Sequence, residues 1–78
     1  MEMESFQIVI GNNPAQTFEV RDYLHHEEDR CKFEVFQDGK MLVSLEPDED
    51  SLRICKNPGR LDVETIHLII DKIEYYYL

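Results

Sequence analysis

Basic residues are scarce in this chain of 78 residues: eight lysines and arginines stand against seventeen aspartates and glutamates, giving a formal net charge of −9. Nonspecific binding to nucleic acid or to an anionic membrane requires a basic patch, so neither is expected as a direct partner. Two readings of the charge remain. Either the acids form an ordinary solvated surface, or they imitate a nucleic acid and occupy the basic site of a nucleic-acid-binding protein.

Long hydrophobic runs are also absent, since the wholly apolar stretches are only a few residues long and cannot form a membrane span. The first residues, Met1-Glu2-Met3-Glu4, lack the basic and apolar regions of a signal peptide. A cytoplasmic location is therefore expected. In a reducing compartment the two cysteines should be free thiols, and no disulfide is expected between them. Strand alternation predicts that Cys31 is buried on the inward face and that Cys55 lies on the opposite face.

Motifs for catalysis, cofactor binding or metal binding are missing as well. Three glycines do not supply a phosphate-binding loop, and neither cysteine lies in a local nucleophile signature. We expect neither an enzyme nor a cofactor. Zinc ligands are present by type, but without Cys-x-x-Cys or His-x-x-x-His spacing, so a metal site is not predicted. These residues are His25, His26, Cys31, Cys55 and His67.

Acidic residues gather between 46 and 50, where Glu46 and the run Asp48-Glu49-Asp50 could offer oxygen ligands to calcium. An EF-hand loop needs a glycine at its sixth position, and counting from Asp48 that position is Arg53. The spacing therefore favours a solvated acidic loop.

The last quarter of the chain predicts one amphipathic helix over residues 62–77, with Asp62 as its N-cap. Its apolar stripe repeats at intervals of three and four residues. A helix of this length needs a surface on which to bury that stripe. The stripe consists of Val63, Ile66, Ile70, Ile73 and Tyr77.

That surface is predicted to be a sheet, because alternating apolar residues indicate five strands at 6–10, 17–24, 31–36, 41–45 and 52–56. Short connections favour an antiparallel meander. The expected fold is a two-layer α+β domain, in which a five-stranded antiparallel meander sheet is covered on one face by the single C-terminal helix. The residues assigned to the covered face are Phe6, Ile8, Phe18, Val20, Phe33, Val35, Met41, Val43, Leu45 and Ile54.

Two details of the strands can be predicted further. A three-residue loop, Gln37-Asp38-Gly39, would pair Phe36 with Lys40 and Val35 with Met41, with Gly39 at positive φ. Strict alternation would point Asp22 inward. Either a bulge near Arg21 turns Tyr23 inward, or Asp22 lies at the rim of the sheet.

The function predicted from these patterns is a protein-interaction or self-association module, and an acidic inhibitor imitating nucleic acid is the alternative. Apolar residues assigned to outer surfaces support an interface, because grouped exposed apolar side chains mark one. Tyrosine in particular combines apolar area with a polar tip. The candidate partner-binding residues are Val9, Tyr23, Phe36 and Leu42 on the open sheet face, with Leu68 and Tyr75 on the helix.

Overall fold

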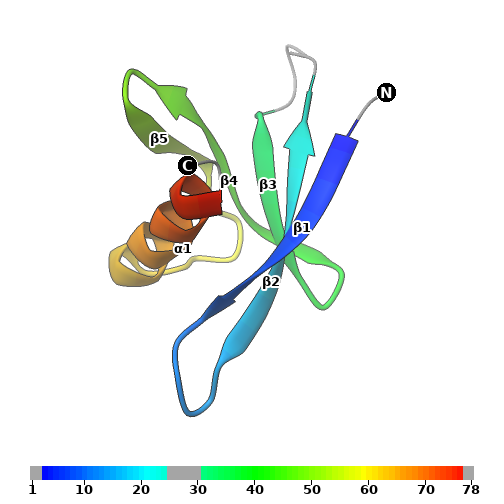
Figure 1. Cartoon of the computed structure of the whole chain (residues 1–78), viewed down its shortest axis with the longest axis vertical. Helices are drawn as coiled ribbons and strands as arrows, with labels where there is room; N and C mark the ends of the chain where they lie inside the picture. The colour runs from blue at the N-terminus through cyan, green and yellow to red at the C-terminus, as the bar shows by residue number, and fades with distance from the viewer. Residues whose placement is uncertain (1–2, 25–30, 77–78) are drawn as a thin grey trace.

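The computed structural model describes residues 3–24 and 31–76 and contains one five-stranded antiparallel sheet and one helix (Figure 1). The strands pair in sequence order, so the predicted meander is confirmed. The helix contacts β1 and closes an α+β fold, as predicted. The elements are β1 (Met3–Ile10), β2 (Gln16–Tyr23), β3 (Phe33–Gln37), β4 (Lys40–Asp48), β5 (Ser51–Lys56) and α1 (Val63–Tyr76).

The β1–β2 hairpin keeps one continuous register from Met3↔Tyr23 to Ile10↔Gln16. Its connection contains Gly11 and Asn13 at positive φ, a conformation that glycine and asparagine adopt readily in turns. Since no bulge interrupts β2 in this pairing, alternation carries Asp22 to the same face as Phe18 and Val20. Asp22 forms the last pair of the β2–β3 ladder, at the rim as one alternative expected, yet it is buried.

The β3–β4 connection differs from the prediction. A two-residue turn of Asp38 and Gly39, both at positive φ, pairs Gln37 with Lys40 and Phe36 with Met41. The expected loop and register are therefore wrong, although Gly39 does have positive φ. A bulge on β4 then shifts the register, so that Val35 pairs with Val43. The apolar residues of β3 and β4 beyond the bulge therefore lie on the same face of the sheet.

That bulge changes the positions of two side chains. Met41 lies opposite Phe36, on the face away from the helix, so its assignment to the covered face is wrong. Leu42, the extra residue, packs against the core cluster and contradicts its assignment to the open face.

β4 also runs further than predicted, because Pro47 continues the strand and pairs with Leu52. The register with β3 ends at Leu45, so at Pro47 the strand has a ladder neighbour on one side. Proline is tolerated at such an edge position. A second register shift, between Ser44 and Leu45, leaves Cys55 as an extra residue on β5.

The helix begins one residue after its predicted N-cap. The Thr65 backbone N–H and hydroxyl donate to the Asp62 carboxylate at 3.3 Å and 2.5 Å, which confirms the cap. The buried stripe is Ile66, Ile69, Ile70 and Ile73. Val63 is exposed, so its place in the stripe was wrong, while Tyr77 lies outside the described residues.

The core lies between the helix and the inner faces of β1 to β4. Ile54 was predicted to belong to it, but this residue on the outermost strand β5 is 46% exposed. The fully or nearly fully buried side chains are Ile8, Ile10, Phe18, Val20, Phe33, Val35, Val43, Leu45, Ile66, Ile69, Ile70 and Ile73.

Candidate functional site

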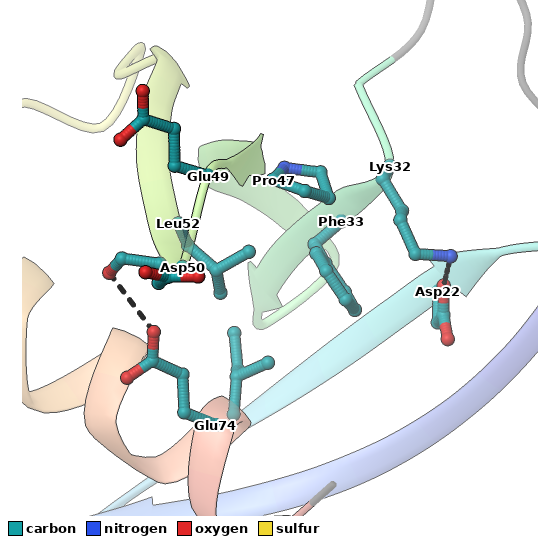
Figure 2. A pocket seen from close by; sticks show the side chains of 10 residues that line it. Asp22, Lys32, Phe33, Pro47, Glu49, Asp50, Leu52 and Glu74 are labelled. Atoms are coloured by element: carbon teal, nitrogen blue, oxygen red, sulfur yellow. Dashed lines mark hydrogen bonds and ion pairs between the residues drawn. The ribbon is translucent and has the colours of Figure 1, made fainter.

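A groove of about 580 Å³ lies between the β4–β5 turn and the C-terminal part of α1 (Figure 2). Its two walls come from segments far apart in the sequence, and the Ser51 hydroxyl donates a hydrogen bond to Glu74 Oε2 between them at 3.0 Å. Ligand pockets in proteins usually have volumes of a few hundred to about 1,000 Å³, so the groove is large enough to bind a side chain or a short peptide segment. Its lining consists of Asp22, Lys32, Phe33, Pro47, Glu49, Asp50, Ser51, Leu52, Ile73 and Glu74.

Apolar and acidic side chains share this lining. Phe33 and Ile73 contribute buried apolar surface, and Leu52 is half-buried. Glu49 and Asp50 on the β4–β5 turn are exposed. The combination favours a ligand with both apolar and positively charged groups.

One end of the groove is neutralised by an internal ion pair. Lys32 Nζ lies 2.8 Å from Asp22 Oδ1 (Figure 2), and the Asp22 side chain is 4% exposed against 37% for Lys32. A buried carboxylate needs such a partner, because removing a charge from water is costly. The remaining acids of the groove, Glu49, Asp50 and Glu74, lie on the β4–β5 turn and the helix.

The sheet face opposite the helix carries paired charges. Arg21 stacks over the Phe36 ring at 3.9 Å and donates through Nε to Glu19 Oε2 at 3.0 Å. This hydrogen bond raises the pKa of Arg21. The Tyr23 hydroxyl donates to Glu34 Oε1 at 2.6 Å, and Arg53 pairs with Glu46. Glu19, Glu34 and Glu46 on this face therefore each have a neighbouring donor.

The six predicted partner-binding residues are not brought into one surface. Val9, Leu68 and Tyr75 are exposed, at 51%, 50% and 77%. Phe36 is half-buried beneath Arg21, while Tyr23 is buried.

Leu42, the sixth, is held by the segment between β5 and α1. The Gly59 N–H donates to the Leu42 carbonyl at 2.9 Å, and the Leu42 side chain packs against the core.

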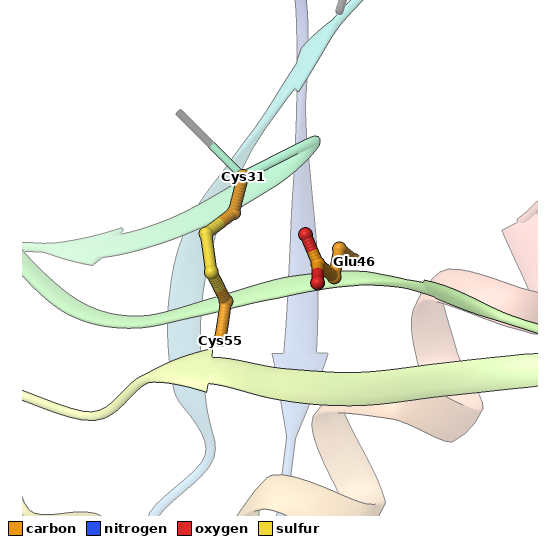
Figure 3. Close-up of side chains that lie close together, drawn as sticks. All are labelled: Cys31, Glu46 and Cys55. Carbon is orange, nitrogen blue, oxygen red and sulfur yellow. A yellow bond between two sulfur atoms is a disulfide. The ribbon is translucent and has the colours of Figure 1, made fainter. Parts of the chain in front are cut away.

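Cys31 and Cys55 form a disulfide, with their Cα atoms 6.4 Å apart (Figure 3). The predictions of free thiols and of opposite faces are therefore wrong, although Cys31 is buried as expected. The inward assignment of Cys31 is the part that fails, because its sulfur lies with Cys55 and Glu46, and Glu46 is on the open sheet face. Cys31 precedes β3 and lies outside the ladder from which its face was predicted.

A carboxylate accompanies the two sulfurs. Cys31 Sγ, Cys55 Sγ and a carboxylate oxygen of Glu46 all lie within 4.8 Å of one another. Arg53 holds Glu46 through Nε at 3.0 Å from Oε1 and through Nη2 to the same oxygen. This hydrogen bond raises the pKa of Arg53.

In the described part of the chain, this cluster is the one group of three or more residues with metal-ligand atoms placed together. His67 is exposed on the helix and is not part of it. His25 and His26 lie outside the described residues.

The chain matches no protein-family model, no curated protein and no solved structure. Within residues 3–24 and 31–76, the single helix is too short to cross a bilayer.

The sequence predicted neither the groove nor the cluster of Cys31, Cys55 and Glu46, because each is formed by segments far apart in the chain. Glu74 was part of a helix pattern and Asp50 part of an acidic loop, and nothing in either pattern places them side by side. The acidic run from 48 to 50 was the one visible signal for the groove. Likewise Cys31 and Cys55 are 24 residues apart, and Cys31 lies before β3, where strand alternation does not fix its direction.

Proposed function

We propose that this chain is a small protein-interaction module without enzymatic activity. Its groove between the β4–β5 turn and α1 would receive a segment of a partner protein that carries apolar and basic side chains. The single observation that carries the proposal is the composition of the groove, in which Glu49, Asp50 and Glu74 accompany Phe33, Leu52 and Ile73. A lysine or arginine of the partner would lie near the carboxylates while its apolar neighbours contact the buried surface.

The charge of the whole chain supports a basic partner in preference to a second copy. At a net charge of −9, two copies repel each other, whereas a basic partner is attracted over a distance and associates faster. Val9, Leu68 and Tyr75 would then contribute to a wider contact surface, or remain as isolated exposed residues of the ordinary kind.

The distribution of ion pairs favours the groove over the alternative of a nucleic-acid mimic. Such a mimic presents a row of carboxylates, but on the open sheet face Glu19 and Glu46 are paired with arginines and Glu34 accepts from Tyr23. The groove is where carboxylates and apolar surface coincide.

The proposal can be tested with short labelled peptides in which lysine and leucine alternate, beside peptides of glutamate and leucine. We expect the basic peptide to shift the backbone amide resonances of Leu52 and Ile73, and its affinity to fall as salt is added. Glu74→Gln should weaken binding several-fold. Glu64→Gln removes the same charge from the exposed first turn of the helix and serves as the matched control.

Two outcomes would contradict the groove as the binding site. In one, the basic peptide shifts resonances of the open sheet face and leaves those of the groove unchanged. In the other, Glu74→Gln and Glu64→Gln weaken binding equally, which would show a general effect of charge.

A further inference from the structure

Cys31, Cys55 and Glu46 bring together two sulfurs and a carboxylate from three separate segments (Figure 3). Cys31 precedes β3, Glu46 lies in β4 and Cys55 lies in β5. We propose that this cluster, once its disulfide is reduced, binds a single Zn²⁺ ion through the two thiolates and the Glu46 carboxylate. The sheet would thus hold either a disulfide or a zinc ion at the same place.

The spacing of the cluster suits the metal. Zinc binds thiolate sulfur at about 2.3 Å and carboxylate oxygen at about 2.0–2.2 Å, with tetrahedral geometry. Tetrahedral angles at these lengths place the ligand atoms roughly 3.5–4 Å apart. The ligand atoms already lie within 4.8 Å of one another, so breaking the S–S bond lets the sulfurs move to this separation by small side-chain rotations. Three protein ligands leave the fourth position to water.

The chemical step needs a dithiol reductant. One thiolate of the reductant attacks a sulfur of the disulfide, forms a mixed disulfide and releases the other cysteine as a thiolate. The second thiol of the reductant then attacks the mixed disulfide and releases the remaining cysteine as a thiolate. The reductant leaves as a cyclic disulfide. Two electrons have passed to the protein, and zinc binding holds both cysteines as thiolates, displacing their protons.

Arg53 fits the charge and the orientation that such a site requires. Two thiolates and a carboxylate carry three negative charges, which Zn²⁺ and the Arg53 guanidinium together balance. Both Arg53 donations go to Oε1 of Glu46, an arrangement that fixes the carboxylate and leaves Oε2 to the metal. Partners of this kind orient metal ligands and increase metal affinity.

Ser44 supplies an independent observation. Its Oγ is buried and has no hydrogen-bond partner within residues 3–24 and 31–76. Ser44 precedes Glu46 by two residues, which places both on one face of β4, and Cys55 is inserted opposite the Ser44–Leu45 step. A buried hydroxyl without a partner is costly. Because Cys55 is inserted opposite this step of β4, we expect its released thiolate to accept a hydrogen bond from Ser44.

The test is a zinc titration of the whole chain, oxidised and dithiol-reduced, followed by calorimetry and by circular dichroism. We expect the reduced protein to bind one equivalent of zinc and the oxidised protein to bind none. Reduction should lower the melting temperature, and zinc should raise it again, because a ligand of the folded state stabilises that state. Cobalt in place of zinc should give thiolate-to-metal charge-transfer absorption.

Glu46→Gln isolates the carboxylate, and we expect it to weaken zinc binding by the reduced protein at least tenfold. Glu19→Gln is the matched control, since Glu19 also pairs with an arginine on the open sheet face, and it should bind zinc like the unaltered chain. The proposal is overturned if the reduced chain binds no zinc. Equal affinities of the Glu46→Gln and unaltered chains would also overturn it, because two cysteines of an unfolded chain would then explain the binding.

Discussion

At the scale of single residues, Gly59 shows how closely the segment before the helix is fitted to β4. A Cβ atom at this position would lie 2.9 Å from the Leu42 Cα and from its Cδ2. A backbone atom cannot move aside as the tip of a side chain can. The absence of a side chain at Gly59 therefore allows the contact that holds Leu42 against the core.

Gly59→Ala should destabilise the protein, by about 1–3 kcal/mol, because it forces atoms into a packed contact. Glycine-to-alanine changes at unstrained, open positions have the opposite sign. Urea unfolding measures the difference. Gly39→Asn is the comparison, since no atom crowds its position and only the positive φ opposes a side chain there. Asparagine tolerates positive φ better than most residues, so this change should cost less than Gly59→Ala. A Gly59→Ala variant as stable as the unaltered chain would show that the contact relaxes without cost.

Asp62 gives a prediction about pH. The hydrogen bond from the Thr65 hydroxyl lowers the pKa of Asp62 below its ordinary value, with a smaller effect of the Thr65 backbone N–H. The folded state thus favours the carboxylate. Its contribution to stability is fully present above the ordinary aspartate pKa, about 3.9, and is lost as the pH falls through the lower pKa of the folded state.

Asp62→Asn retains a capping side chain but cannot ionise, so it should remove this pH-dependent part alone. We expect the stability difference between the unaltered chain and the variant to shrink between neutral pH and the acid range below about pH 4. Urea unfolding at several pH values gives the difference. Thr65→Ala removes the hydroxyl donor and should have the same signature; a difference independent of pH would contradict the assignment.

At the scale of elements, alternation and helical periodicity predicted the five strands, their order and the helix, because these patterns are local. Positions after a bulge could not be predicted in this way. Leu42 is an extra residue on β4, and an inserted residue reverses the faces expected on one side of it. For this reason the core strands were predicted well, whereas Met41 and Leu42 were placed on the wrong face.

The helix offers a direct comparison of its two faces. Ile69 is fully buried, while its neighbour Leu68 is 50% exposed. Ile69→Ala should cost about 2–5 kcal/mol, since it removes buried apolar surface and leaves a cavity. Leu68→Ala should change the stability of the isolated chain by less than about 0.5 kcal/mol.

Denaturant unfolding of the two helix variants checks this difference, and light scattering of Leu68→Ala shows whether the exposed face takes part in self-association. Similar losses of stability from both substitutions would contradict the assignment of the two faces.

At the scale of the whole molecule, the attraction within close ion pairs competes with the repulsion among acidic side chains that lie further apart. Ion pairs engage Arg21, Lys32 and Arg53 with adjacent carboxylates. The chain as a whole nevertheless has nine more acidic than basic residues. Exposed ion pairs such as those of Arg21 and Arg53 contribute little to stability, and salt weakens the pair of the buried Asp22 with Lys32 only slightly. The repulsion among the remaining acids should therefore dominate the response to salt.

Moderate sodium chloride should therefore raise the melting temperature. Salt at physiological strength screens charges separated by more than about 8 Å, which weakens the repulsion among dispersed carboxylates more than the close pairs. Thermal unfolding in low and moderate salt measures the effect, and a second chloride salt with a different cation separates screening from binding of a particular ion. Glu74→Gln removes one acid of the groove and should reduce the increase. A melting temperature that is unchanged or lower in moderate salt would show that the local ion pairs outweigh the net repulsion. In that case the affinity of the groove for a basic partner would depend more on its apolar lining than on its carboxylates.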